Sequence, residues 1–205
     1  MPAPCASRFA GPVTEQTAQQ RAQQSQPGYD GMWVDPAHDP RDTDEPPVGE
    51  KGTLRQYLDH YRMTFELKCE GLTHEQLATR SVEPSTMSLL GLVRHLAKVE
   101  QHWFRRVLEA QEDLPHLYDS EEDPDLDFNG AAGTEECVAE AWATWRREVA
   151  HSREVFERCD DLGGTFVPGE PWTVRGVVVH MIEEYARHAG HADLLRECLD
   201  GRTGQ

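Results

Sequence analysis

The sequence predicts an all-α protein: a four-helix bundle preceded by a mostly irregular N-terminal arm. Four segments carry apolar residues at helical spacing, no segment alternates like a strand ladder, and proline is concentrated near the N-terminus. At 205 residues the chain is long enough for one domain with a buried core plus a tail. Four amphipathic helices bury their apolar faces most simply by packing as a bundle.

The predicted arm comprises residues 1–50, which hold eight of the thirteen prolines and the acidic stretch DPRDTDEPPVGE. Such a segment buries too little apolar surface to offset the entropy lost on ordering, so we expect most of it to be disordered. Residues 29–36, YDGMWVDP, are the exception, because their apolar and aromatic side chains offer enough area to dock on a folded body. The bundle is then expected to occupy residues 51–205.

The first helix is predicted to begin near Thr53, where apolar residues take up helical spacing, and to stop at Gly71. GLTHEQLATR is then expected to form a turn or a one-turn helix. A second helix follows in PSTMSLLGLVRHLAKVEQHWFRRVLEA, whose apolar residues keep a 3.6-residue period. Ser85 and Thr86 are the candidates for its N-terminal cap.

The second and third helices are joined by QEDLPHLYDSEEDPDLDFNGAAG, a charged stretch without a helical period. Connections this long are uncommon in bundles and often serve as functional lids or rims. Thr134 is predicted to cap the third helix. The fourth helix is predicted to start after Thr173 and to stop before Gly201, a length of roughly 40 Å at ~1.5 Å per residue.

The formal net charge of −17 at pH 7 argues against nucleic acid or an anionic membrane as a partner, because both would repel the chain. No apolar run reaches the roughly 18–20 residues that span a bilayer, and the first residues lack the pattern of a secretory signal. We therefore expect a cytoplasmic protein. The five cysteines include no CxxC pair, which argues against a zinc knuckle or a disulfide framework.

The predicted fourth helix places polar side chains on its inward face. At about 100° per residue, one stripe of this helix combines core-facing apolar residues with His180, Glu184, His188 and His191. Unpaired polar groups are costly in a bundle interior, so this stripe is expected to have a partner.

His95 on the second helix is a candidate partner, since its own stripe also faces inward. Glu184 and His188 are spaced i, i+4, which places both on one face, where they can share an ion with His95. Three protein ligands with a position left for water or substrate are typical of catalytic zinc, and this donor set also accepts nickel, iron or manganese. Alternatively, Glu184 and His188 only stabilise the helix, and the inward histidines only hydrogen-bond their neighbours.

The remaining polar residues near these stripes each have two interpretations. His191 is a candidate general base, because an imidazole pKa near 6.5 suits proton transfer, or it supports the ligands by hydrogen bonding. His180 either orients the carboxylate ligand or is an ordinary hydrogen-bonded core histidine. Arg94 and Arg187 are candidates for binding a thiol cofactor or a carboxylate substrate, although each can also be a solvated charge.

LLGLVRHLAKVEQHWF followed by VVVHMIEEYARHAGHADLLRE resembles the DinB-like (DinB/YfiT) superfamily of four-helix bundles, which includes metal-dependent thiol transferases. ELKCEGLTHEQL, PSTMSLLGLVRHLA and HADLLRECLDG are similar to an actinobacterial group of that superfamily described as a domain of unknown function. The resemblance covers about residues 30–201. It implies a metal held by His95, Glu184 and His188. Many members have histidine in place of Glu184, whereas the related mycothiol-dependent maleylpyruvate isomerases resemble this chain in using His, Glu and His.

The resulting hypothesis is a metal-dependent transferase that adds a low-molecular-weight thiol to an electrophilic small molecule. A divalent ion, zinc before nickel, iron or manganese, would lower the pKa of the thiol, and the resemblance implies mycothiol as that thiol. The alternatives are a metal-dependent hydrolase of an amide or ester, a non-catalytic stress-response bundle that binds metal or a small ligand, and a bare structural bundle. A homodimer formed through helix faces is compatible with the sequence, but no residue indicates one.

Overall fold

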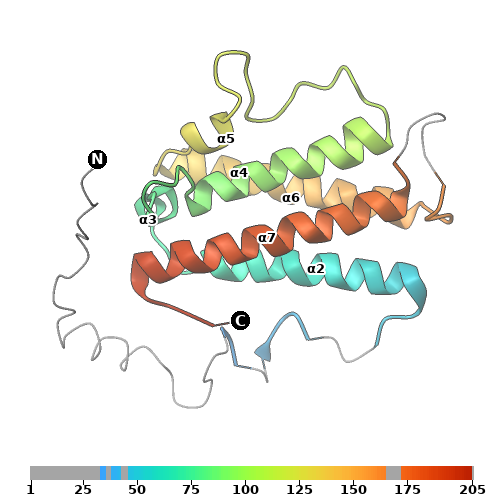
Figure 1. Ribbon diagram of the computed structural model, residues 1–205, viewed down its shortest axis with the longest axis horizontal. Helices are drawn as coiled ribbons and strands as arrows, with labels where there is room; N and C mark the ends of the chain where they lie inside the picture. The colour runs from blue at the N-terminus through green and yellow to red at the C-terminus, as the bar shows by residue number, and fades with distance from the viewer. Residues whose placement is uncertain (1–32, 36–37, 43–45, 165–171, 205) are drawn as a thin grey trace, which may run out of the picture.

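The structure, a computed structural model, describes residues 33–35, 38–42, 46–164 and 172–204, and every regular element in these ranges is helical (Figure 1). The predicted all-α four-helix bundle is confirmed. Its long helices are α2 (Gly49–Cys69), α4 (Leu89–Glu100) with its continuation η2 (Gln101–Leu108), α6 (Glu135–Glu157) and α7 (Val174–Asp200). Two short helices lie in the connections, α3 (His74–Ala78) and α5 (Leu126–Asn129).

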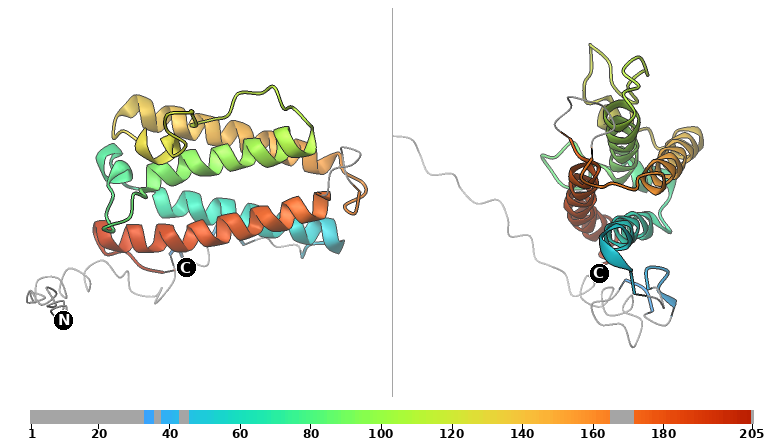
Figure 2. Two further views of the ribbon diagram at one scale, coloured as in Figure 1. Left: turned by 45° about the horizontal axis from the view of Figure 1, so that its top comes forward. Right: turned by 90° about the vertical axis from the view of Figure 1, so that its right-hand side faces the viewer.

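Viewed from the end of the bundle, α4 packs against both α6 and α7, and α2 packs against α7 (Figure 2). The helices α4–η2 and α7 run in opposite directions. His95 faces His188, and Trp103, eight residues after His95, faces His180, eight residues before His188. We call the line of contact between α4–η2 and α7 the α4–α7 seam.

Apolar side chains from the long helices fill the bundle interior. Phe65 of α2, Leu92 of α4, Val155 of α6 and Met181 of α7 are among those fully excluded from solvent. Burying one such side chain contributes ~1.5–3 kcal/mol relative to leaving it exposed. This packed core holds the helices at fixed spacing, which positions the side chains of the seam. None of the described helices combines the length and apolarity needed to cross a membrane.

Hydroxyl side chains cap three of the long helices. Thr134 accepts from the backbone N–H of Cys137, and Thr173 accepts from that of Gly176, which confirms both predicted caps. The predicted cap of the second helix was wrong. Ser88, not Ser85 or Thr86, caps α4 by accepting from Gly91 N at 3.1 Å. The physical reason is that residues before it are held in a turn, with the Ser85 N–H bonded back to the Val82 carbonyl.

The second predicted helix is not α-helical along its whole length. From Gln101 to Leu108 it continues as the π-helix η2. A π-helix bonds i to i+5, so it turns less per residue and sets later side chains back around the axis relative to an α-helix. The hydrophobic period of the sequence did not predict the π-helix. The change in helical turn rotates the later side chains only slightly, and a rotation of this size lies within the width of an apolar stripe. Segments of this kind are frequent at functional sites.

A polar network crosses the middle of the bundle and joins all four long helices. Arg62 of α2 donates to both carboxylate oxygens of Glu100 at 2.8 Å. The Tyr185 hydroxyl of α7 also donates to Glu100 at 2.8 Å, and Trp145 Nε1 of α6 donates to the Tyr185 oxygen at 2.9 Å. Burial, with the Glu100 charge, raises the pKa of Tyr185 well above its ordinary value, so the hydroxyl keeps the proton it donates. We call these four residues the central network.

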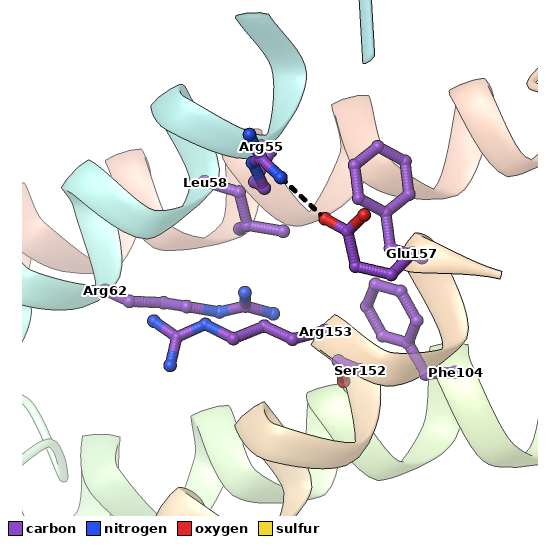
Figure 3. A pocket seen from close by; sticks show the side chains of 8 residues that line it. Arg55, Leu58, Arg62, Phe104, Ser152, Arg153 and Glu157 are labelled. Atoms are coloured by element: carbon purple, nitrogen blue, oxygen red, sulfur yellow. Dashed lines mark hydrogen bonds and ion pairs between the residues drawn. The ribbon is translucent and has the colours of Figure 1, made fainter. Parts of the chain in front are cut away.

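A small cavity of about 20 Å³ lies on the opposite side of the bundle from the seam, between α2 and α6 (Figure 3). Leu58 and Phe104 line it with apolar surface, and the ion pair of Arg55 and Glu157, at 2.8 Å, borders it. Such a volume holds about one water molecule, so we assign no ligand to it.

Trp33, from the segment before the bundle, is buried against the ends of α2 and α7. Its Nε1–H donates to the Leu67 carbonyl at 3.1 Å, and the cations of Lys68 and Arg202 lie 4.2 and 4.1 Å from its ring centroid. Residues 29–32 and 36 of the predicted docking stretch lie outside the described residues, as does the chain before them. The division into an arm of residues 1–50 and a bundle of 51–205 therefore stays a prediction.

Candidate metal centre

Three side chains from the two helices of the seam converge on one point. His95 of α4 and Glu184 and His188 of α7 each offer one ligand atom, and these atoms all lie within 4.8 Å of one another. The convergence follows from the fold, because an antiparallel neighbour brings His95 opposite the i, i+4 pair on α7. We call these three residues the His–Glu cluster. The structure thus contains a possible His/Glu/His metal site.

The carboxylate of Glu184 lies between two imidazoles of its own helix. Its oxygens are 3.4 Å from His188 Nε2 and 3.5 Å from His180 Nε2. The hydrogen bond with His188, together with the charges of the neighbouring imidazoles, holds the pKa of Glu184 below its ordinary value. Glu184 is therefore a carboxylate anion at neutral pH. His180 contacts this carboxylate, which is compatible with both predicted roles of His180, orienting the carboxylate and being an ordinary hydrogen-bonded histidine.

His95 is braced by a residue that sequence reasoning missed. Its Nδ1 lies 2.9 Å from Oδ2 of Asp127, which is buried at the start of α5. Phe128 stacks on the imidazole with the ring centroids 5.4 Å apart. Because Asp127 occupies Nδ1, Nε2 is the atom that His95 can offer to an ion. The one available signal was the position of Asp127 in the long acidic connection, where it is one of many carboxylates.

His191 contacts the cluster through His188. The Nδ1 atoms of the two rings are 3.3 Å apart, so one of them donates and the other accepts. Burial and the charges of His188 and Arg187 lower the pKa of His191. The contact is compatible with both predicted roles of His191, general base and support for the ligand. Arg187 lies on the exposed side of α7 beside His191.

Arg94 is buried and its guanidinium is bonded to the connection that carries Asp127. Nε donates to the Asp127 carbonyl at 2.9 Å, and a terminal nitrogen donates to the Leu126 carbonyl at 3.0 Å. The guanidinium also stacks on the Tyr118 ring, 4.0 Å from its centroid. Arg94 thus holds α5 against α4, which places it behind His95 rather than beside the converging ligand atoms. Its predicted contact with a thiol or substrate stays a prediction.

The His–Glu cluster is partly exposed, and its donor atoms are of the kinds that bind divalent metal ions. The side chains of His95, Glu184 and His188 retain 24%, 17% and 10% of their exposure. Two nitrogen donors and one carboxylate suit zinc and other divalent transition metals. Both histidines have an Nδ1 contact that fixes their rings, and such contacts are common around metal ligands. The residue types and their proximity therefore fit a bound divalent ion.

Comparison with known proteins identifies a family whose model matches this chain. A family model described as Mycothiol-S-transferase matches residues 53–201, which contain the whole His–Glu cluster. A solved structure described as a conserved protein from Enterococcus faecalis matches with a TM-score of 0.57 at 16% identity, over 77% of this chain and 100% of that chain. At that identity the likeness concerns the fold alone. The comparison with curated proteins gave no match.

Proposed function

The chain belongs to the mycothiol-S-transferase family, and we propose that it is a metal-dependent transferase that joins mycothiol to an electrophilic small molecule. The observation that carries the proposal is the convergence of His95, Glu184 and His188 within 4.8 Å on a partly exposed seam. A bare structural bundle would give no reason to gather three ligand atoms at such a place, because polar groups near a core are costly without partners.

His95, Glu184 and His188 are the residues that would hold the ion, with zinc as the first candidate and nickel, iron and manganese as others. When bound, the ion supplies positive charge that lowers the pKa of a nearby thiol toward neutrality. Asp127 keeps the His95 ring in one orientation, and His191 does the same for His188.

In the reaction, the thiol sulfur forms a bond to an electrophilic carbon. The thiol proton passes to a base, and the displaced electron pair departs with a leaving group or moves into a conjugated acceptor. We assign the base to His191, which is half-buried and in contact with His188. Arg187, on the exposed side of the same helix, is the proposed contact for a carboxylate of the thiol or substrate.

The test compares the parent protein with His188→Ala, and with His74→Ala as a matched control, because His74 is an exposed histidine on α3. We expect about one divalent ion per chain in the parent and control and none in His188→Ala. Transfer of mycothiol to a fluorogenic electrophile should fall by more than the roughly 10–100-fold that loss of a supporting residue costs.

Two outcomes would contradict the proposal. Full thiol transfer by His188→Ala would exclude a role for the ion. Turnover of an ester or amide by the parent without added thiol, and none with it, would identify a metal-dependent hydrolase instead.

A further inference from the structure

A second group of side chains lies on the α4–α7 seam, next to the His–Glu cluster. Trp103 of η2, Trp172 just before α7 and His180 of α7 form an aromatic cluster. The Trp103 centroid is 4.7 Å from that of Trp172 and 4.6 Å from that of His180, and Trp172 to His180 is 6.5 Å. Trp172 retains 41% of its exposure, so the cluster is open to solvent.

The aromatic cluster is joined directly to the proposed metal ligands. His180 Nε2 lies 3.5 Å from the carboxylate of Glu184, which in turn contacts His188 at 3.4 Å. The Trp103–His180 pair lies eight residues, about two helical turns or roughly 12 Å, along the seam from the His95–His188 pair. A small molecule lying on the seam would therefore reach from one cluster to the other.

The π-helix explains how Trp103 comes to face the seam. Trp103 is the third residue of η2, directly after the point where the backbone widens. In a continuous α-helix it would lie about 80° around the axis from His95, and the slower turn of η2 brings it back toward the His95 side. The widening thus aligns an indole ring with a metal-ligand candidate on the same seam.

The chemistry of the aromatic cluster selects a class of ligand. Indole rings are electron-rich and bind planar, electron-poor rings by stacking and edge contacts. Small-molecule sites are lined mainly by apolar and aromatic groups with a few polar ones, and here His102 and His180 supply imidazoles beside two indoles. Burial, with nearby positive charges, lowers the pKa of His102, which favours its neutral form beside the rings.

We propose that Trp103 and Trp172 bind the planar, electron-poor aromatic part of the electrophile, with its reacting carbon directed along the seam toward the His–Glu cluster, an inference that rests on the proposed function. The substrate class is then an activated aromatic or conjugated electrophile. A small aliphatic electrophile would not use the aromatic cluster.

Binding is tested first, independently of turnover. Isothermal titration of the parent with meta-dinitrobenzene, a planar electron-poor ring whose nitro groups are not displaced by thiols under these conditions, is compared with Trp172→Ala and Trp142→Ala. Trp142 is the matched control, because it is a half-buried tryptophan on α6, away from the seam. We expect Trp172→Ala to weaken binding by roughly ten-fold, the scale of one aromatic contact plus lost burial, and Trp142→Ala to bind like the parent. An absence of binding to the parent, or equal binding by Trp172→Ala and the parent, would overturn the proposal.

Turnover then separates this inference from the proposed function. With mycothiol, Trp172→Ala should lose roughly ten-fold in kcat/KM toward chlorodinitrobenzene and be unchanged toward iodoacetamide, at unchanged metal content. An equal loss toward both electrophiles would overturn the aromatic site. If the parent binds dinitrobenzene through Trp172 but transfers thiol to neither electrophile, the proposed function fails and the aromatic site stands.

Discussion

The central network and the His–Glu cluster share the helices α4 and α7 and include residues adjacent in sequence, yet they differ in how their polar atoms are satisfied. In the central network, Glu100 receives hydrogen bonds from Arg62 and Tyr185 and is fully excluded from solvent. In the His–Glu cluster, three ligand atoms approach one another on a surface that stays partly exposed. Glu184 and Tyr185, neighbours in sequence, belong to the two different groups.

This difference separates a structural role from a chemical one. A buried carboxylate is stable when hydrogen-bond donors satisfy its oxygens, and a carboxylate satisfied in this way has no lone pair left for a ligand. Side-chain atoms that converge without satisfying one another can still bind an ion. The two groups are therefore expected to respond to substitution in different measurements: the free energy of unfolding for the central network, and metal affinity for the His–Glu cluster.

The largest expected effect is on stability, from Glu100→Ala. The change removes the acceptor of two hydrogen bonds from the buried Arg62 guanidinium, which keeps only its contact with the Asp59 carboxylate at 3.1 Å, and should lower the free energy of unfolding by ~3–5 kcal/mol. Urea unfolding measures this, with Glu66→Ala as the control. Glu66 pairs with Arg146 at the surface, so its loss should cost less than about 1 kcal/mol. Equal costs for the two variants would show that the central network is not the structural centre.

Asp127→Asn is expected to change the metal affinity of the His–Glu cluster rather than the free energy of unfolding. Asparagine keeps the shape of the side chain and can still hydrogen-bond His95, but it removes the negative charge that would strengthen His95 as a metal ligand. Zinc affinity, measured by competition with a chromophoric chelator, should fall by roughly 10–100-fold while unfolding changes little. Asp125→Asn, at an exposed position of the same connection, should leave affinity unchanged. An unchanged affinity in Asp127→Asn would remove Asp127 from the site.

The smallest effect is expected from Tyr185→Phe, which tests the boundary between the two groups. Phenylalanine fills the same space but removes the hydroxyl that links Trp145 to Glu100, at a cost of ~1–2 kcal/mol in unfolding. Metal affinity should stay within about two-fold of the parent, because the phenyl ring still fills the buried position of Tyr185 and His95, Glu184 and His188 are unchanged. A large loss of metal affinity would mean that the two groups act as one network.

Much of the fold could be predicted from the sequence because its signals are local. Thr134 and Thr173 stand directly before periodic stretches, and both cap the helices that follow. The cap of α4 was harder to predict, because three hydroxyl residues occur within four positions before the helix. The turn that binds the Ser85 N–H leaves Ser88 to make the cap. Local sequence does not distinguish these residues, since the choice depends on the path of the preceding loop.

In the candidate site, too, the residues placed by local spacing could be predicted, and the residue placed by a distant contact could not. His95, Glu184 and His188 were predicted together because helical spacing and inward stripes can be read along one chain, and the structure brings them together; their function as ligands stays a prediction. Asp127 was missed because its contact with His95 joins residues 32 apart through an irregular connection. Nothing in the spacing of that connection indicates which of its carboxylates is buried.

By itself, therefore, the sequence determined the helices, the all-α class and the polar stripe on the last helix, because each depends on periodicity and capping within a few residues. Only the tertiary structure decided that Asp127 would contact His95 and that His191 would contact His188. It also decided that Arg62 would pair with Glu100 rather than with Glu184. The π-helix η2, finally, brings Trp103 to His180. These outcomes depend on contacts between distant segments, and the packing of the four helices, not the pattern within any one of them, brings such segments together.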